Sequence, residues 1–390
     1  MTPEARPETW REGGFGLYAH WPFCEAKCPY CDFNSHVVRS IDQTRWADAL
    51  SSEVRRYGEM TSGRILNSIY FGGGTPSLME PATVQAVLDA AKEHWTWAND
   101  IEITLEANPR SVEVSKFEGF REAGVNRVSM GIQSLRPDDL RRLGRLHDVD
   151  EAIVALETAK SVFERVNFDL IYARENQTLK GWETELREAL DLAADHLSLY
   201  QLTIEEGTMF WERAQRGQMK HLPDEDLAAD MFLATQEITS KAGYSPYEVS
   251  NHALPGAQSR HNLVYWRGGD YVGVGPGAHG RVTVNGTRHA TEAWKMPGAW
   301  IEKAEAGRGD SVFDALTTED IMTEFVMMGL RLGEGISLSR LAAISPKPLP
   351  AHKLAELQDL GLIWRENDLV GATTEGRLVL NGVLSELLTN

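Results

Sequence analysis

The three cysteines of this chain lie in one short segment of its sequence. Cys24, Cys28 and Cys31 form the pattern C-x3-C-x2-C, and Tyr30 directly precedes the last of them. Thiolates are the usual iron ligands of iron–sulfur clusters, so this loop can hold three irons of a [4Fe–4S] cube. The fourth iron would then have no protein ligand. An iron with an open position can bind a second molecule and take part in its chemistry.

Two other uses of the cysteines are open at this point. A structural zinc site needs four ligands, and either His20 or His36 lies near enough in the sequence to supply the fourth. A disulfide would leave one of the three cysteines unpaired, and no other feature of the chain is typical of a secreted protein. The cluster therefore remains the best interpretation of the pattern.

The composition is acidic. Across 390 residues, 57 Asp and Glu outnumber 39 Lys and Arg, which gives a formal charge of −18. Because this charge repels phosphate backbones, we expect no nucleic-acid partner. The sequence predicts no transmembrane segment, and its first residues lack the apolar region of a signal peptide. We therefore expect a cytoplasmic protein, and a reducing compartment also suits a thiolate site.

The elements that must position the cysteines form a βα series. Six strands are predicted, each rich in β-branched or aromatic residues: Gly16–His20, Ile65–Phe71, Ile101–Glu106, Asn126–Gly131, Val166–Tyr172 and His196–Thr203. Helices are predicted between them at Asp42–Tyr57, Pro81–His94, Ser111–Ala123, Asp150–Phe163 and Thr178–Ala194. Such alternation builds a parallel sheet, and six units are fewer than the eight of a closed barrel. We predict an α/β fold with a partial, TIM-like (β/α)6 barrel.

The chain divides into four predicted parts. An N-terminal tail at residues 1–15 precedes the barrel at 16–243, which includes a helix at Pro223–Ala242. A Gly- and aromatic-rich α+β extension follows at 244–316. At 317–390 the pattern is helix, helix, hairpin and helix, which suggests a small winged-helix-like module. The negative charge argues against DNA binding by this module, so we expect it to serve packing or gating.

Ligands of parallel βα folds collect at the carboxyl ends of the strands. The cysteine loop follows the first predicted strand, and Gly72, Gly73, Gly74 and Thr75 follow the second. Missing side chains allow close backbone approach there, and exposed N–H groups can hold a carboxylate. A simple tight turn is the alternative.

Polar side chains also stand at or near the ends of later strands. Glu106 and Gln133 could hold an ammonium group and ribose hydroxyls, although each could instead cap the next helix. Asp169 interrupts an apolar strand, where an unpaired charge would be costly. It therefore needs a partner, either a ligand hydroxyl or Arg145.

Together these motifs make the chain resemble the radical S-adenosylmethionine (SAM) superfamily, whose signature is C-x3-C-x2-C with an aromatic residue before the last cysteine. The Gly-Gly-Gly-Thr-Pro turn at residues 72–76 supports the resemblance. The resemblance implies that the open iron binds the amino and carboxylate groups of SAM. The cofactor then supplies the radical chemistry, and the protein positions it and excludes water.

Within the superfamily the chain is similar, from about residue 16 to its end, to the oxygen-independent coproporphyrinogen III oxidase group. That similarity implies two sets of SAM contacts. The first site would be lined by Tyr18, Gly73, Glu106 and Thr203. Positions that contact a second SAM in the oxidase are Tyr30, Gly74, Thr75, Gln133, Arg145 and Asp169. Longer side chains in the run Ala173-Arg174-Glu175-Asn176-Gln177 are expected to narrow this second site.

Two departures point to the heme-chaperone (HemW) branch of the group. The oxidase has a further cysteine where this chain has Phe33, and a longer N-terminal arm. The branch also carries an H-N-x-x-Y-W motif, present here at residues 261–266. An imidazole is a standard heme ligand and Tyr265 and Trp266 offer flat apolar surfaces, so His261 is the expected heme ligand. A buried His–Asn pair is the alternative use of the motif, and His279, His252 and His289 are rival ligands.

The resemblance thus implies a heme chaperone with a [4Fe–4S] cluster, SAM and heme. Its expected partners are heme-acceptor proteins and a reducing electron-donor protein. Oxidative decarboxylation of coproporphyrinogen III and radical methyl transfer are the alternative functions.

Overall fold

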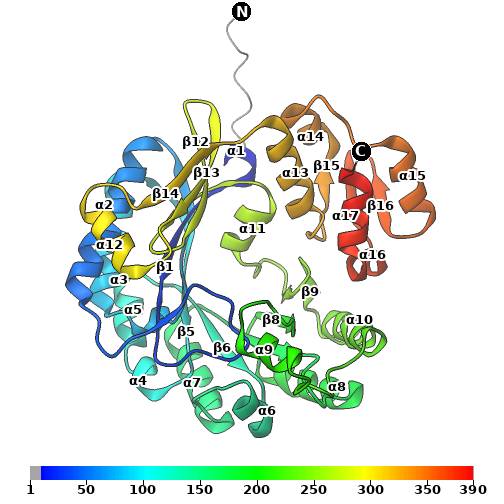
Figure 1. Cartoon of the computed structure of the whole chain (residues 1–390), viewed down its shortest axis with the longest axis horizontal. Coiled ribbons are helices and arrows are strands. Elements are labelled where there is room, and N and C mark those ends of the chain that lie inside the picture. Colours follow the sequence, from blue (N-terminus) through cyan, green and yellow to red (C-terminus); the bar gives the residue numbers. More distant parts are fainter. Residues whose placement is uncertain (1–9, 390) are drawn as a thin grey trace, which may run out of the picture.

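The computed structural model describes residues 10–389 of the chain. A 12-stranded sheet, in the order β14-β13-β12-β11-β1-β4-β5-β6-β7-β8-β10-β9, curls around a central space (Figure 1). The six predicted strands are present in the predicted order and are parallel: β1 (Phe15–Trp21), β4 (Ile65–Gly73), β5 (Thr96–Ala107), β6 (Arg127–Gln133), β7 (Arg165–Tyr172) and β8 (His196–Gln201). The fold class is therefore confirmed.

The strand pleat separates an apolar outer face from a polar inner one. On β1, Leu17 and Ala19 are fully buried in the main core, and Tyr18 lies between them on the opposite face. The same alternation places Glu106 of β5 and Asp169 of β7 on the inner side, where both line one cavity. A period of two thus directs the polar residues of successive strands into a common space.

Helices cover the outer face of the curl (Figure 1). They are α2 (Gln43–Met60), α3 (Pro81–His94), α4 (Ser111–Val114), α5 (Phe117–Ala123), α6 (Pro137–Arg142), α7 (Val149–Val162), α8 (Leu179–Leu192) and α10 (Glu225–Lys241). The single helix predicted over residues 111–123 is two helices. Glu113 turns inward to accept hydrogen bonds from Ser77 and from the Asn108 backbone, whereas Phe117 packs in the main core. A single continuous helix could not place both Glu113 at its hydrogen-bond donors and Phe117 in the main core.

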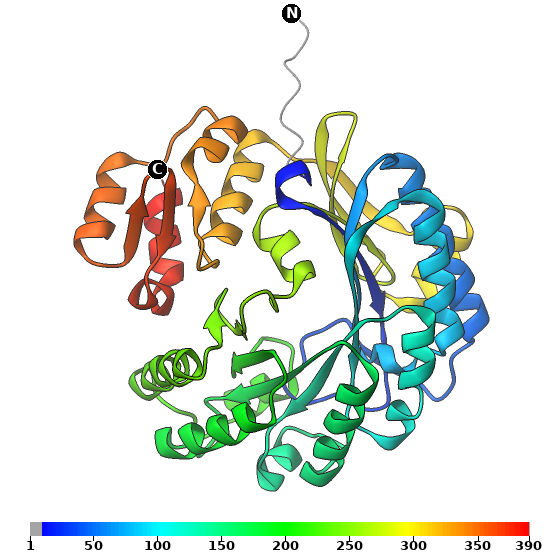
Figure 2. The same cartoon turned by 180° about the vertical axis from the view of Figure 1, so that it is seen from behind.

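The strands of the extension enlarge the same sheet. β11 (Asp270–Val274) pairs in parallel with β1, and β12 (His279–Val284), β13 (Thr287–Ala293) and β14 (Asp310–Ala315) continue from it in antiparallel fashion. At the other edge lie β10 (Asn251–Ala253) and β9 (Ser245–Pro246). Between these edges, α11 (Arg260–Trp266) carries the H-N-x-x-Y-W motif and packs inside the curl against β1, β4 and β11 (Figure 2).

Asp270, at the start of β11, anchors this region. Its carboxylate is fully buried and pairs with Arg64 at 2.7 Å and with Arg288 at 2.6 Å. The backbone N–H of Thr283 also donates to it, at 2.5 Å. This set of bonds joins the turn between α2 and β4 to β11 and to the β12–β13 hairpin.

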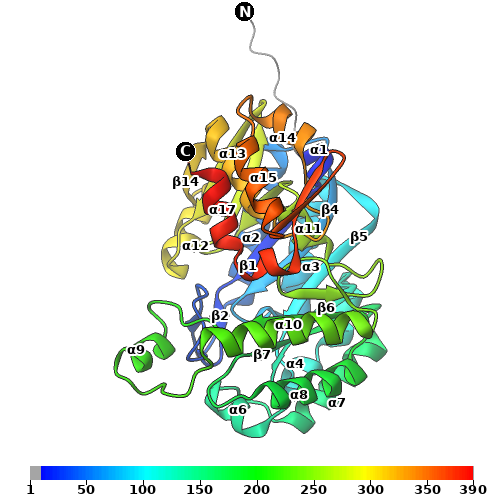
Figure 3. The same cartoon turned by 90° about the vertical axis from the view of Figure 1, so that its right-hand side faces the viewer.

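The C-terminal residues form a smaller unit with its own core (Figure 3). It contains α13 (Thr318–Gly329), β15 (Ile336–Ser337), α14 (Leu338–Ile344), α15 (Ala351–Asp359), β16 (Ile363–Glu366), β17 (Leu369–Ala372), α16 (Thr374–Leu378) and α17 (Leu380–Leu388). Val326, Val370 and Val383 are among its buried residues. The last predicted helix is interrupted at Val379, which lies between α16 and α17. Within residues 10–389, no helix combines the length and apolarity needed to cross a membrane.

Candidate functional site

The cysteine loop lies at the carboxyl end of β1, between β2 (Phe23–Cys24) and β3 (His36–Val37). Its entry is fixed by the glycine turn after β4, because the Gly74 N–H donates to the Trp21 carbonyl at 2.7 Å and the Thr75 N–H donates to the Phe23 carbonyl at 2.8 Å. Cys24, Cys28 and Cys31 all line one cavity of about 340 Å³. The structure therefore brings the three predicted ligands together.

Hydrogen-bond donors surround the three sulfur atoms. The Thr75 hydroxyl donates to Cys24 Sγ and the Arg145 guanidinium donates to Cys28 Sγ, each at 3.4 Å. Ser35 Oγ lies 4.0 Å from Cys31 Sγ. Burial raises the pKa of Cys24 and of Cys31. Donors of this kind stabilise thiolates, so three sulfurs with polar support around a cavity suit an iron–sulfur cluster.

The histidines proposed as a fourth zinc ligand are engaged elsewhere. His20 Nδ1 is bonded to the Tyr18 hydroxyl and Nε2 to the Asn34 carbonyl, both at 2.9 Å. His36 Nε2 contacts Asn34 Oδ1 at 3.1 Å. The geometry therefore favours the cluster over a zinc site.

A single side chain ties the cysteine loop to the extension, and we call it the Asn34 clasp. Asn34 Nδ2 donates to the Pro276 carbonyl at 2.9 Å and to the Lys295 carbonyl at 2.8 Å. A Cβ at Gly277 would approach this nitrogen to 2.7 Å, so the glycine leaves room for the clasp. The loop is thereby held between the turn after β4 and the turns that flank β12 and β13.

The glycine turn requires its glycines. A Cβ at Gly74 would lie 2.7 Å from the Phe23 carbonyl oxygen, which is backbone and cannot rotate away. Gly73 has φ +113°, a conformation that side chains disfavour, and its N–H donates to Glu106 Oε2 at 3.1 Å. The turn therefore forms one wall of the cavity and also orients the carboxylate.

Glu106 is held at the end of β5 by two donors, Gly73 and the Tyr70 hydroxyl, which lies 2.8 Å from Oε1. Burial raises its pKa to about 7, in spite of these hydrogen bonds. A carboxylate that is costly to ionise because it is buried gains from a cationic ligand. Its position fits the binding of an ammonium group.

Gln133, Arg145 and Asp169 form a second polar group on the same cavity. Gln133 has a positive φ of 72°, and its Oε1 is buried without a hydrogen-bond partner, as is Arg145 Nε. A strained backbone and orphaned polar atoms on one cavity are typical of a ligand site. Arg145 donates to the Gly131 carbonyl at 2.8 Å, and its guanidinium also binds Asn108.

Of the two partners that the sequence left open for Asp169, Arg145 forms its hydrogen bonds elsewhere. The Asp169 carboxylate accepts from Ser129 Oγ at 3.4 Å, whereas Arg145 bonds to Cys28, Asn108 and Gly131. Burial raises the pKa of Asp169 to about 6. The carboxylate therefore retains the capacity to accept from a ligand hydroxyl.

The first cavity contains nearly all predicted cofactor residues: Cys24, Cys28, Tyr30, Cys31, Gly73, Gly74, Thr75, Glu106, Gln133, Arg145, Asp169 and Thr203. Tyr18 lines the neighbouring cavity instead. Sequence reasoning missed Asn108 and Tyr200, which also line the first cavity. Asn108 lies just beyond the end of a predicted strand, which is the signal that could have found it, whereas Tyr200 lies within a predicted strand.

The expected narrowing of the second SAM site does not occur. Arg174 is nearly fully buried, and its guanidinium pairs with Glu185 and, at 3.0 Å, with Asp139. Neither Arg174 nor Glu175 lines the cofactor cavity; they line a smaller one of about 130 Å³. The ion pair with Glu185 of α8 holds the Arg174 guanidinium away from the cofactor cavity.

A second cavity, of about 710 Å³, lies on the other side of the cysteine loop. The two cavities share Gly73 and Glu106 and part of the loop itself, including Lys27 and Phe33. The shared wall means that a molecule in the second cavity would be adjacent to the cluster site.

His261, the expected heme ligand, lies behind this second cavity. The side chain is 1% exposed. Its Nδ1 is bonded to Ser68 Oγ at 2.9 Å and its Nε2 to the Tyr265 hydroxyl at 2.6 Å. Burial lowers its pKa to about 3. In this conformation both ring nitrogens are occupied, as in the alternative use of the motif, although the partners are Ser68 and Tyr265 rather than Asn262.

Comparison with known proteins agrees with this geometry. Residues 18–189 match the radical SAM superfamily, and residues 316–379 match the HemN C-terminal domain. The chain is 44% identical to the heme chaperone HemW of Haemophilus influenzae over 388 residues, which cover 96% of this chain and 97% of the relative. It is 37% identical to the mitochondrial radical S-adenosyl methionine domain-containing protein 1 of Bos taurus, covering 96% of this chain and 87% of the relative.

The fold likewise matches that of the radical SAM enzyme coproporphyrinogen III oxidase (HemN) from Escherichia coli, with a TM-score of 0.80 and 24% identity over 96% of this chain and 90% of that one. Membership in the superfamily implies a [4Fe–4S] cluster and SAM, and the residues of the first cavity fit both groups. The chain belongs to the radical SAM superfamily, in the group that carries a HemN C-terminal domain.

Proposed function

We propose that this protein is a heme chaperone: it binds heme and transfers it to acceptor proteins, and it carries a [4Fe–4S] cluster and SAM. The observation that carries the proposal is the second cavity, which adjoins the cluster loop and is lined by Tyr265, Trp266 and Tyr271. Aromatic walls suit a flat apolar macrocycle. The full-length similarity to proteins named heme chaperones supports the same assignment.

In this proposal Cys24, Cys28 and Cys31 hold the cluster, which when bound supplies an electron to SAM. Glu106 and the glycine turn hold the amino-acid end of SAM, and Asp169 accepts from a ribose hydroxyl. Arg145 donates to Cys28 and so connects the cysteine loop to the second polar group. We place the protein in the cytoplasm, with an electron-donor protein and heme acceptors as its partners.

Oxidative decarboxylation of coproporphyrinogen III is the second candidate. It is favoured by the complete set of polar residues on the first cavity, which includes the positions expected at a second SAM site. It is disfavoured by Phe33, which is 57% exposed at the position where the oxidase has a further cysteine.

One preparation separates the two functions. The cluster is reconstituted anaerobically, and the same sample is assayed for heme binding by absorbance and for conversion of coproporphyrinogen to protoporphyrinogen. We expect stoichiometric heme binding, transfer of that heme to an apo-cytochrome and no turnover. Turnover of the porphyrinogen, or absence of heme binding, would refute the chaperone proposal.

A further inference from the structure

The second cavity has the chemistry of a heme site in addition to its aromatic walls. Its volume of about 710 Å³ lies within the range of ~300–1,000 Å³ that is usual for small-molecule sites. Lys27 and Lys295 line it as well. Heme carries two carboxylates on one edge of its ring, and lysines at the edge of an apolar cavity suit them.

Three histidines also line this cavity, and they differ in whether a ring nitrogen is available. Both nitrogens of His20 are bonded, and one nitrogen of His36 is bonded to Asn34. His279 is exposed at the start of β12, and its ring makes no hydrogen bond to any side chain or backbone group in residues 10–389. A heme ligand needs one accessible imidazole nitrogen. Of the three histidines, His279 can offer an imidazole nitrogen to iron without breaking a hydrogen bond of its ring.

The rival histidines outside the cavity are less accessible. His252 is fully buried, and its Nε2 lies 3.4 Å from the Gln236 side chain. His289 packs its ring against Phe313, with 4.8 Å between ring centroids. For His261 to bind iron, its bond to Tyr265 would have to break and the tyrosine ring would have to leave the cavity wall.

The wall opposite the cysteine loop is held rigid from behind. The His261 ring supports Tyr265 through the 2.6 Å hydrogen bond, and the Tyr265 ring packs edge-on against Tyr271, with 4.3 Å between centroids. A heme contacting this wall would meet aromatic surfaces that are already in place, so little ordering is needed on binding.

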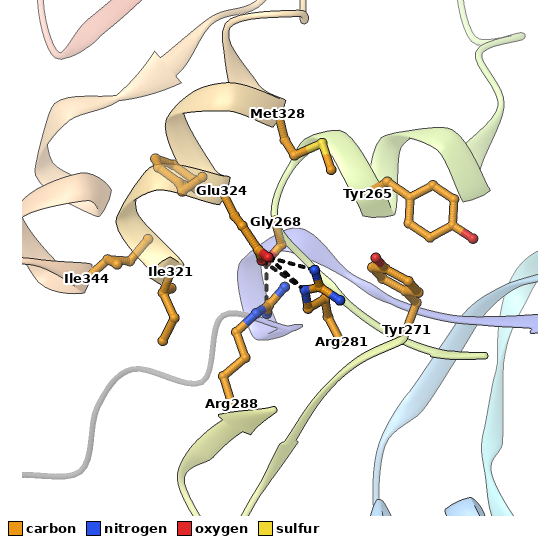
Figure 4. Close-up of a pocket in the computed structure, with 10 residues that line it drawn as sticks. Tyr265, Gly268, Tyr271, Arg281, Arg288, Ile321, Glu324, Met328 and Ile344 are labelled. Carbon is orange, nitrogen blue, oxygen red and sulfur yellow. Dashed lines mark hydrogen bonds and ion pairs between the residues drawn. The ribbon is translucent and has the colours of Figure 1, made fainter. Parts of the chain in front are cut away.

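The C-terminal unit completes the same wall. Arg281 of β12 and Glu324 of α13 form a two-pronged ion pair, with Nη2 and Nε at 2.7 and 2.9 Å from Oε1. Met328 lies four residues after Glu324, on the same face of the helix, and extends towards Tyr265 (Figure 4). The ion pair thus fixes the position of a polarisable apolar side chain on the cavity.

We propose that heme binds in this second cavity with His279 as its iron ligand, and that His261 is a positioning residue that holds Tyr265 in the wall. The inference rests on the proposed function and assigns its ligand site. It also gives the H-N-x-x-Y-W motif a role in shaping the cavity, since two of its residues line the cavity and the histidine supports one of them.

The test is titration of reconstituted protein with ferric heme, followed by absorbance and electron paramagnetic resonance. His279→Ala should weaken binding by about ten-fold or more and abolish the histidine-ligated spectrum, and added imidazole should restore that spectrum. His352→Ala, an exposed histidine of α15, is the matched control and should behave as the wild type. His279 is exposed, so its replacement should not impair folding.

His261→Ala and Tyr265→Phe test the positioning role. Both should reduce affinity and leave the iron-ligand spectrum unchanged. The inference is overturned if His279→Ala keeps the wild-type spectrum, or if His261→Ala or Tyr265→Phe abolishes it. Failure of the wild type to bind heme would instead refute the proposed function, so the two failures are distinguishable.

Discussion

Replacing Glu106 should raise the stability of the protein without cluster or SAM and weaken its affinity for SAM. Burial raises the pKa of this carboxyl from 4.5 to about 7. Below the unfolded pKa the group is neutral in both states and contributes nothing. As the pH rises towards 7 the unfolded chain ionises first, so the folded state loses stability until the folded group has ionised too.

The size of this effect follows from the pKa difference. The difference between the pKa of 4.5 and that of about 7, at about 1.36 kcal/mol per pKa unit, corresponds to a cost of about 3.4 kcal/mol well above pH 7. Glu106→Gln removes this cost. The amide oxygen can still accept from the Gly73 N–H, and the amide nitrogen can donate to the Tyr70 hydroxyl. The gain should therefore be below about 1 kcal/mol at about pH 5 and reach about 3 kcal/mol at about pH 8.5.

The assay is urea unfolding of the cluster-free variant and wild type, followed by tryptophan fluorescence at both pH values. Calorimetric titration with SAM on reconstituted protein supplies the second readout. Wild-type affinity should increase as pH rises towards 7, because the amino group of SAM on the open iron donates its N–H groups more strongly to an ionised carboxylate. Glu106→Gln should bind weakly at every pH, and Glu118→Gln, at an exposed site, should match the wild type. A pH-independent stability difference, or SAM affinity that falls as pH rises, would refute the reasoning.

Three further predictions concern the surroundings of the site. Arg145→Met should shift the cluster's reduction potential to more negative values, because it removes a charged donor from Cys28 Sγ. In a redox titration Arg142→Met, at an exposed site, is the control, and an unchanged potential in Arg145→Met would contradict the prediction. Asp270→Asn should destabilise the protein by about 3–5 kcal/mol in urea unfolding, since two buried guanidiniums lose their carboxylate, whereas Asp100→Asn in the exposed pair with Arg260 should cost less than about 1 kcal/mol. Gly74→Ala should lower the iron content after reconstitution, because its Cβ would displace the Phe23 backbone. Gly298→Ala places its Cβ in open space and should leave the iron content unchanged. Equal iron content in the two variants would argue against the role of the turn.

The local pattern of apolar and β-branched residues predicted the strands of the barrel well. Each predicted strand ends within a few residues of its observed end, and polar residues at strand ends share one edge by the geometry of a parallel sheet. Glu106, Gln133 and Asp169 therefore could be placed together from sequence. β11 could not, because its partner β1 lies far away in the chain and pairing across such a distance leaves no local signal.

The environment of individual side chains was less predictable. His261 has the chemistry of a heme ligand, but Ser68 and Tyr265 bind both of its nitrogens, and neither contact follows from the spacing of the motif alone. Arg174 was expected in the cofactor cavity because of its length and charge, yet Glu185 and Asp139 hold it elsewhere. In both cases a contact between distant segments decides the role of the residue.

The Asn34 clasp has a consequence for the biosynthesis of the protein. Asn34 precedes its two acceptors by 242 and 261 residues, so a ribosome adding about 5–20 residues per second needs roughly 10–50 s to make them after the cysteines. During this interval the loop lacks one of its two anchors, and its thiols are more open to oxidation. We expect iron–sulfur assembly to occur on the completed chain, and truncated translation products that end before β12 should not retain iron.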